Sequence, residues 1–105
     1  MSTVTYADTA VEVDAEGFLT DPAQWNREIA AAIAAEAGIP ELSDRHWQVV
    51  EFMRDAYLEN GAAPSIRTLG KASGVPIKEL YQLFPKGPAK LAAKIAGIPK
   101  PRGCI

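Results

Sequence analysis

The sequence predicts a mostly α-helical protein: a small orthogonal helical bundle with a helix-turn-helix-like element, an N-terminal β-hairpin and an extended C-terminal arm. Three observations lead to this prediction. Apolar residues recur at helical spacing, capping and terminating residues bracket five such segments, and two prolines near the C-terminus prevent a further helix. A chain of 105 residues can bury one core and not two. We therefore expect one domain over residues 1–97 and a flexible arm over residues 98–105.

The N-terminal segment has the composition of a β-hairpin. Residues 3–7 and 10–14 are rich in β-branched side chains, and Asp8 and Thr9 lie between them. Two isolated strands are only marginally stable. This hairpin is therefore expected to pack against another part of the domain.

A first helix is predicted from Asp21 to about Ala37. Asp21 can cap it, and Gln24 can reach back to the cap. Pro22 suits the first helical position, and Gly38 is a common terminator. Apolar side chains follow at four-residue spacing, at Trp25, Ile29, Ile33 and Ala37. Such a stripe is typical of core packing.

Ser43 and Gly61 bracket a second helix, predicted over residues 44–60. It is amphipathic, with apolar positions at Trp47, Val50, Met53 or Arg54, and Tyr57. His46, the only histidine, lies in its first turn. Because no second ligand stands near it, we interpret His46 as a surface or capping residue and predict no metal site.

Glycine and proline residues divide the remaining chain into three short helices. They are predicted over residues 66–72, 77–84 and 89–96, and Gly97 ends the last one. The first two, with the glycine turn between them, match a helix-turn-helix.

The helix-turn-helix leaves a DNA-binding regulator open as an alternative function. Its Ala-Ser-Gly-Val turn and the Leu-Tyr pair that follows resemble the DNA-binding module of tetracycline-repressor-type regulators. In that case Lys78 and Gln82 would face the groove. However, Lys78 is the only base of this helix and stands beside Glu79, whereas phosphate binding normally takes several cations. The sequence pI is about 5.3. Nucleic acid is therefore the less favoured partner.

Charge is divided unevenly along the chain, whose net charge is −2. Residues 1–60 hold twelve acidic and three basic residues, whereas residues 61–105 hold eight basic residues and one acidic residue. Two differently charged solvated faces would explain this pattern, and so would an anionic partner for the C-terminal half. Charge alone favours neither reading.

The only cysteine, Cys104, stands one residue from the C-terminus, which excludes an intramolecular disulfide. The segment around it has too little apolar content for a core element, so the thiol is expected to be exposed. A thiol reacts as thiolate, and Lys100 and Arg102 supply positive charge that favours this form. Gly103 lets the backbone approach another surface closely. Further bases that can contribute to the thiol environment and to partner docking are Lys86, Lys90 and Lys94.

Several stretches that together cover nearly the whole chain resemble one family. They are residues 14–19 with Trp25, 46–47, 52–59, 64–69, 83–90 and 94–105. The last, Lys-Ile-Ala-Gly-Ile-Pro-Lys-Pro-Arg-Gly-Cys-Ile, is the most specific. On these residues the chain resembles the DsrC/TusE family. That family comprises gamma-subunit-like proteins associated with dissimilatory sulfite reductase and a sulfur-relay protein of tRNA 2-thiouridine synthesis.

The resemblance implies a small helical fold with an N-terminal hairpin and a mobile C-terminal arm. In the family, the penultimate cysteine accepts sulfur as a persulfide from an upstream sulfurtransferase and delivers it to an acceptor protein. That role maps onto Cys104. The expected function is thus a covalent sulfur carrier of sulfurtransferase type rather than a conventional turnover enzyme, and it requires no cofactor.

Two departures from the family pattern are expected to matter. Sulfite-reductase-linked members carry a second cysteine eleven positions before the penultimate one, where this chain has Ala93. This resembles the tRNA-thiolation member and argues against a role as a sulfite-reductase substrate. Both branches are also expected to carry an insertion before Tyr81 that this chain lacks, so its partner could differ.

Location and assembly are predicted from missing signals. The first residues are neither basic nor apolar, and no apolar run approaches the roughly 20 residues that span a bilayer. We expect a cytoplasmic, monomeric protein without membrane contact.

Overall fold

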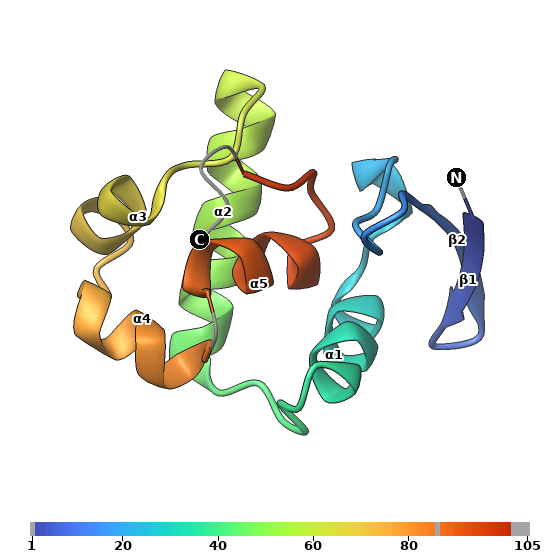
Figure 1. The fold of residues 1–105 in the computed structure, drawn as a ribbon, viewed down its shortest axis with the longest axis horizontal. Helices are drawn as coiled ribbons and strands as arrows, with labels where there is room; N and C mark the ends of the chain where they lie inside the picture. Colours follow the sequence, from blue (N-terminus) through green and yellow to red (C-terminus); the bar gives the residue numbers. More distant parts are fainter. Residues whose placement is uncertain (1, 86, 102–105) are drawn as a thin grey trace.

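The computed structural model describes residues 2–85 and 87–101. Its elements in chain order are β1 (Ser2–Tyr6), β2 (Thr9–Val13), the 3-10 turn η1 (Pro22–Gln24), α1 (Arg27–Glu36), α2 (Asp44–Asn60), α3 (Ile66–Ala72), α4 (Ile77–Leu83) and α5 (Pro88–Ile95). Figure 1 shows the helices around α2 and α5, with the hairpin at one edge beside α1. The predicted helical bundle with an N-terminal hairpin is confirmed.

The hairpin turn lies one residue earlier than predicted. β1 and β2 pair antiparallel, with Val4 opposite Val11, and the two turn residues are Ala7 and Asp8. Both have left-handed backbone conformations, with φ of 51° and 63°. Two-residue hairpins require this conformation, which asparagine, aspartate and glycine adopt most readily. Because alanine is a poor signal for it, the sequence alone misplaced the turn.

The first helix is shorter than predicted, because the chain breaks between η1 and α1. Asp21 caps only the 3-10 turn, and Trp25 and Asn26 are extended. Asn26 then caps α1 with its side chain. Gln24 does not reach back to Asp21; its side-chain oxygen accepts a hydrogen bond from the Glu12 amide at 3.0 Å. A second capping residue and a contact with the hairpin thus override the expected continuous helix.

The helices α2 and α3 have the predicted bounds, because their capping residues decide where they begin and end. Ser43 accepts a hydrogen bond from the His46 amide, and His46 Nδ1 accepts one from the Ser43 amide at 3.0 Å. Gly61 ends α2 in the left-handed conformation. The interpretation of His46 as a capping residue is confirmed. Within residues 2–85 and 87–101, no three His, Cys, Asp or Glu side chains gather as metal ligands would.

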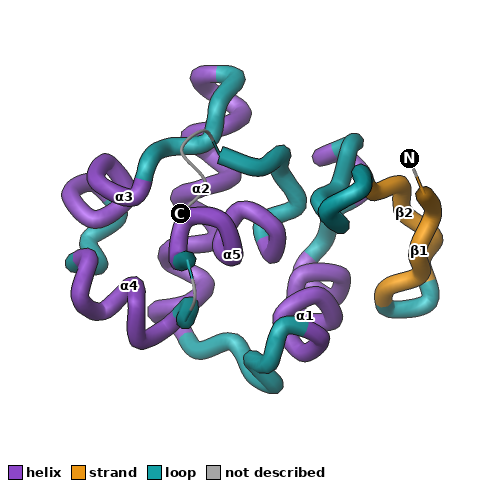
Figure 2. The backbone as a smooth tube through the Cα atoms, in the orientation of Figure 1, coloured by secondary structure: helices purple, strands orange, loops and turns teal. Residues whose placement is uncertain are grey.

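One hydrophobic core joins the hairpin to all five helices. Figure 2 shows α5 against α2 at the centre, and α5 also contacts α1, α3 and α4. Its core face consists mainly of small side chains, at Ala89, Ala92, Ala93 and Ile95. Alanines let the neighbouring helices approach α5 closely, so its position is set from several sides.

The C-terminal end of α5 is closed by a Schellman motif. The Gly97 amide donates to the Lys94 carbonyl and the Ile98 amide donates to the Ala93 carbonyl, both at 3.2 Å. Gly97 has the left-handed φ of 70° that this motif needs. Ile98 is fully buried in the core. The predicted arm therefore begins with a residue that is packed on the body.

The described part of the arm, residues 98–101, is not helical. Pro99 and Pro101 prevent a helix, and the Pro101 side chain is buried. The division of the chain at residue 97 stays a prediction, as does the flexibility expected for residues 98–105.

Replacement of Gly97 by alanine tests how tightly the end of α5 is held. A methyl group at Gly97 would overlap the Trp25 ring, whereas one at Gly61, which has a similar φ of 76°, would meet open space. Both variants carry the cost of a left-handed alanine, about 1 kcal/mol, but only Gly97→Ala adds overpacking of about 1–3 kcal/mol. Urea unfolding should therefore find Gly97→Ala less stable than Gly61→Ala by at least about 1 kcal/mol. Equal losses would contradict the close contact with Trp25.

Candidate functional site

Two side chains from distant parts of the sequence hold the end of α5. Trp25 Nε1 donates a hydrogen bond to the Ile95 carbonyl at 2.7 Å. Arg54 donates to the Ala96 carbonyl at 2.8 Å and to the Pro22 carbonyl at 3.3 Å. These contacts satisfy carbonyls that a helix C-terminus otherwise leaves without partners. They also fix the direction in which the arm leaves the body.

The Arg54 guanidinium suits this place electrostatically. It lies 4.2 Å from the centroid of the Trp25 ring, within cation–π range, and beside the negative end of the α5 dipole. Burial lowers the pKa of Arg54, and neighbouring Asp55 opposes this shift. An arginine stays protonated despite such a shift. We refer to Trp25, Arg54 and Gly97 as the arm anchor.

A salt bridge ties the next part of the arm to the N-terminal half. Lys100 Nζ lies 3.0 Å from Glu16 Oε1 in the turn that follows the hairpin. Pro99, Lys100 and Pro101 also border a hollow of about 210 Å³ beside the C-terminal end of α2. The base of the arm thus lies between α2 and the turn that follows the hairpin.

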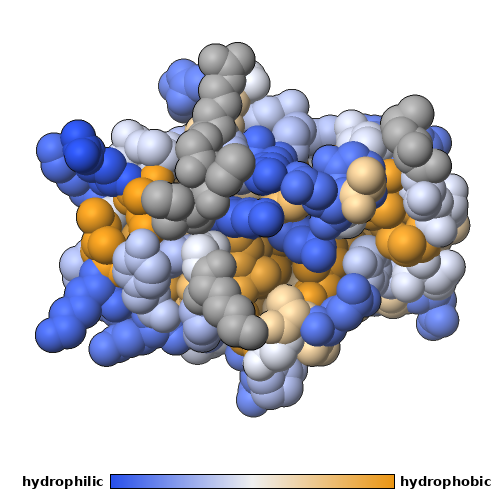
Figure 3. Space-filling model, viewed as in Figure 1, coloured by the Kyte–Doolittle hydropathy of each residue, from blue (hydrophilic) through white to orange (hydrophobic). Residues whose placement is uncertain are grey.

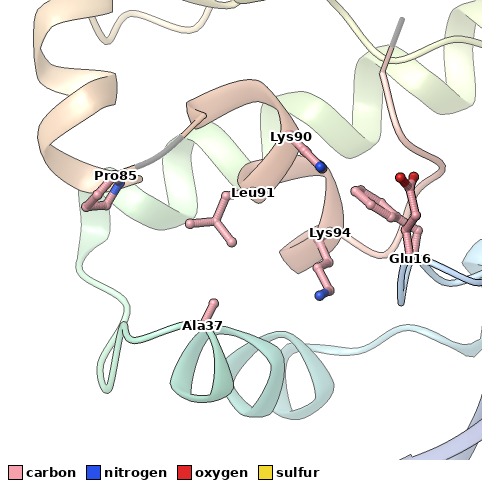
Figure 4. Close-up of a pocket in the computed structure, with 7 residues that line it drawn as sticks. Glu16, Ala37, Pro85, Lys90, Leu91 and Lys94 are labelled. Carbon is pink, nitrogen blue, oxygen red and sulfur yellow. The ribbon is translucent and has the colours of Figure 1, made fainter. Parts of the chain in front are cut away.

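A second cavity, of about 320 Å³, lies between α5, α1 and the turn around Glu16. Lys90 and Lys94 line it from successive turns of α5. Figure 4 shows the Lys90 side chain extending from α5 toward the side on which Glu16 lies, and the Lys94 side chain extending toward α1. Leu91 and Ala37 face each other across the gap. Gly17, with φ of 89°, has no side chain to obstruct Lys94. We call this space the lysine cavity.

Three of the predicted site residues are thus brought together. Lys90 and Lys94 line the lysine cavity, and Lys100 binds Glu16 on its border. The other four, Lys86, Arg102, Gly103 and Cys104, lie outside the described residues. The predicted basic environment of the thiol therefore stays a prediction.

Sequence reasoning missed Arg54 and Glu16 as parts of this region. Arg54 carried a weak signal, since it stands where the apolar stripe of α2 would continue to the next turn. Glu16 carried none, because its partner Lys100 is 84 positions away in the sequence.

The helix-turn-helix is held by an ion pair with α2. Arg45 binds both carboxylate oxygens of Glu79 at 2.7 Å. The hydrogen bonds from Arg45 lower the pKa of Glu79, and partial burial opposes this effect. The same hydrogen bonds raise the pKa of Arg45. The ion pair between Arg45 and Glu79 thus links α4 to α2.

The exposed face of α4 is partly apolar. Lys78 and Gln82 are exposed there, together with Ile77 (41%) and Tyr81 (49%). Figure 3 shows hydrophobic surface near α3 and α4, bordered by hydrophilic side chains. A helix that reads DNA usually presents polar and cationic side chains, so this face does not favour the DNA-binding alternative.

Comparison with known proteins places the chain in a family. The model of the family described as "DsrC like protein" matches residues 5–105. The chain belongs to this family. The gamma subunit of dissimilatory-type sulfite reductase from Nitratidesulfovibrio vulgaris is 43% identical over 105 residues, which is all of both chains. Sulfurtransferase TusE from Salmonella paratyphi A is 51% identical over 102 residues, covering 90% of this chain and 93% of TusE.

A solved structure has the same fold. The crystal structure named dissimilatory sulfite reductase I (DsrI) matches with a TM-score of 0.88 at 42% identity, covering 99% of this chain and 100% of the other. Both relatives named above carry the names of sulfur-metabolising proteins. The DNA-binding alternative gains no support from these comparisons.

One expected departure from the family is wrong. The alignment with the Nitratidesulfovibrio vulgaris gamma subunit spans 105 positions and all of both chains, so that relative has no insertion before Tyr81. The TusE alignment is longer than the part of this chain that it covers, which fits an insertion in that branch. The length of this region therefore does not separate the chain from sulfite-reductase-linked members.

Among the helices formed by residues 2–85 and 87–101, none has both the length and the apolar composition that a bilayer crossing needs.

The Arg45–Glu79 pair predicts a pH-dependent loss of stability. Because the pKa of Glu79 is lowered in the folded protein, the pair stabilises at pH values above the ordinary glutamate pKa. Its contribution is lost as the pH falls from there through the folded pKa. Urea unfolding should find Glu79→Gln less stable than the parent near pH 6.5, and this difference should shrink near pH 3. Glu41→Gln is the control, because Glu41 is exposed and forms no ion pair with another of the described residues. A Glu79 difference that does not change with pH would contradict the assignment.

Proposed function

We propose that this protein is a covalent sulfur carrier that accepts sulfane sulfur on Cys104 and passes it to a partner protein. Membership of the DsrC-like family and relatives named as a sulfurtransferase and as a sulfite-reductase subunit support this function. The only thiol of the chain, that of Cys104, lies a few residues after Ile98 and Pro101, which form the base of the arm.

The observation that carries the proposal is the anchored base of the arm. Ile98 is fully buried and Pro101 is buried, and Cys104 follows Pro101 by three residues. Covalent geometry then limits the Cα of Cys104 to within about 11 Å of the Cα of Pro101. A partner that receives sulfur from Cys104 must therefore also contact the body near the arm base.

The transfer needs neither an oxidant nor a metal. The Cys104 thiolate attacks the terminal sulfur of a donor persulfide, a new S–S bond forms, and the donor thiolate leaves with the electron pair of the old S–S bond. Delivery to the acceptor repeats this exchange, with Cys104 as the leaving thiolate. Lys100 and Arg102 are proposed to favour the thiolate, and Gly103 to let the acceptor approach. Lys86, Lys90 and Lys94 are proposed to assist docking.

The presence of a single thiol limits the sulfur pathways in which the protein can act. Ala93, where sulfite-reductase-linked members have a second cysteine, is fully buried in the core. Cys104 therefore has no internal partner for a disulfide, which favours a role in tRNA thiolation or another sulfur-trafficking route. The proposed partners are an upstream sulfurtransferase and a downstream acceptor protein. We propose that the carrier acts as a monomer in the cytoplasm.

Intact mass measurement tests the carrier function. After reduction and incubation with a small-molecule persulfide donor, the parent should gain one sulfur atom, which dithiothreitol should remove. Cys104→Ser should gain none, because it lacks the only thiol of the chain. Sulfur addition to both proteins, or to neither, would refute the carrier role of Cys104.

A further inference from the structure

The lysine cavity carries positive charge that the described residues do not neutralise. Lys90 and Lys94 are four residues apart on α5, so their ammonium groups repel each other along one face of the helix. Neither forms an ion pair with a carboxylate among the described residues. Glu16, the acidic residue at the border, binds Lys100 of the arm. The cavity thus offers two cations to an incoming anion.

The walls of the cavity are largely apolar. Phe18 contributes to them from the turn after the hairpin, Ala37 from the C-cap of α1, and Leu91 from α5. A small hydrated inorganic ion would leave such walls without contacts. The volume of about 320 Å³ lies at the lower end of the range for binding pockets. This combination suits an apolar side chain next to a carboxylate.

The cavity is linked to the base of the arm. Glu16 lines the cavity and binds Lys100, which precedes the buried Pro101 by one residue. A protein segment seated between Lys90 and Lys94 would therefore lie beside the base from which Cys104 extends. A partner that binds the lysine cavity can then also exchange sulfur with Cys104.

We propose that the lysine cavity docks an acidic segment of a sulfur-transfer partner, in which an apolar side chain adjoins one or two carboxylates. The apolar side chain enters between Phe18 and Leu91, and the carboxylates bind Lys90 and Lys94. Charge complementarity supports an acidic partner, since residues 61–105 hold eight basic residues and one acidic residue. This assignment of a partner class rests on the proposed carrier function.

A peptide titration followed by amide NMR tests the docking site. The probe is acetyl-Gly-Leu-Asp-Leu-Glu-Gly-amide, added to the full-length ¹⁵N-labelled protein. We expect saturable shifts at the amides of Lys90, Leu91, Lys94 and Ala37. The counterpart with Asn and Gln in place of Asp and Glu should bind much more weakly, because it lacks the carboxylates. The counterpart with glycine in place of leucine should also bind much more weakly, because it lacks the apolar side chains.

Two double variants test which lysine residues bind the acidic peptide. Lys90→Gln with Lys94→Gln should weaken binding by about tenfold, as expected for two partly exposed ion pairs. Lys71→Gln with Lys78→Gln removes the same charge from exposed positions on α3 and α4 and should change the affinity by less than about twofold.

Three outcomes would overturn the proposal. The neutral or the leucine-free peptide could bind as well as the acidic one, inorganic phosphate alone could reproduce the shifts, or both variant pairs could weaken binding equally. Sulfur loading from a small-molecule donor separates this site from the carrier function. A parent protein that gains one sulfur but does not bind the acidic peptide would refute the docking site alone, whereas a parent protein that fails to gain sulfur would refute the carrier function.

Discussion

The capped end of α5 is the constraint on which the proposed function depends. A helix that ends in the core leaves carbonyl groups that must find donors, and here Trp25 and Arg54 supply them. Gly97 is the residue that lets the chain turn past the Trp25 ring. Without these contacts the last turn of α5 and the buried Ile98 would separate from the body more easily. The starting point of the arm would then vary.

A fixed starting point matters because so few residues separate it from the thiol. A carrier must present its sulfur to two different partners, and a short arm limits both to the same region of the surface. The Glu16–Lys100 salt bridge and the lysine cavity lie in this region. The uneven charge of the two halves of the chain bears on the choice of partner. The basic half contributes Lys90 and Lys94 to the lysine cavity, and its positive charge favours acidic partners.

The parts of the fold that local chemistry decides were predictable from the sequence. Ser43 and Gly61 set the ends of α2, and Ser65 caps α3 with its side chain. The predicted bounds were wrong where residue type did not indicate the local conformation that the chain adopts. Asn26 provided a cap that interrupted the first helix, and Ala7 adopted a left-handed turn conformation that its residue type does not signal.

The candidate site was predictable only in part, because its geometry is tertiary. The thiol and the nearby bases could be named from the sequence, and the family followed from the C-terminal stretch. The arm anchor could not, since Trp25 meets Ile95 across 70 positions and Arg54 meets Ala96 across 42. The same holds for the lysine cavity, which exists only because the end of α1 and the turn after the hairpin pack beside α5.

Native-state hydrogen exchange along the last residues tests the central claim, an anchored base that carries a reachable thiol. The Ile98 amide, which is hydrogen-bonded and buried, should exchange only through global unfolding, and the Gly103 and Cys104 amides should exchange at nearly the rates of an unfolded peptide. Rapid exchange at Ile98, or protection of Cys104 comparable to that of Ile98, would contradict the account.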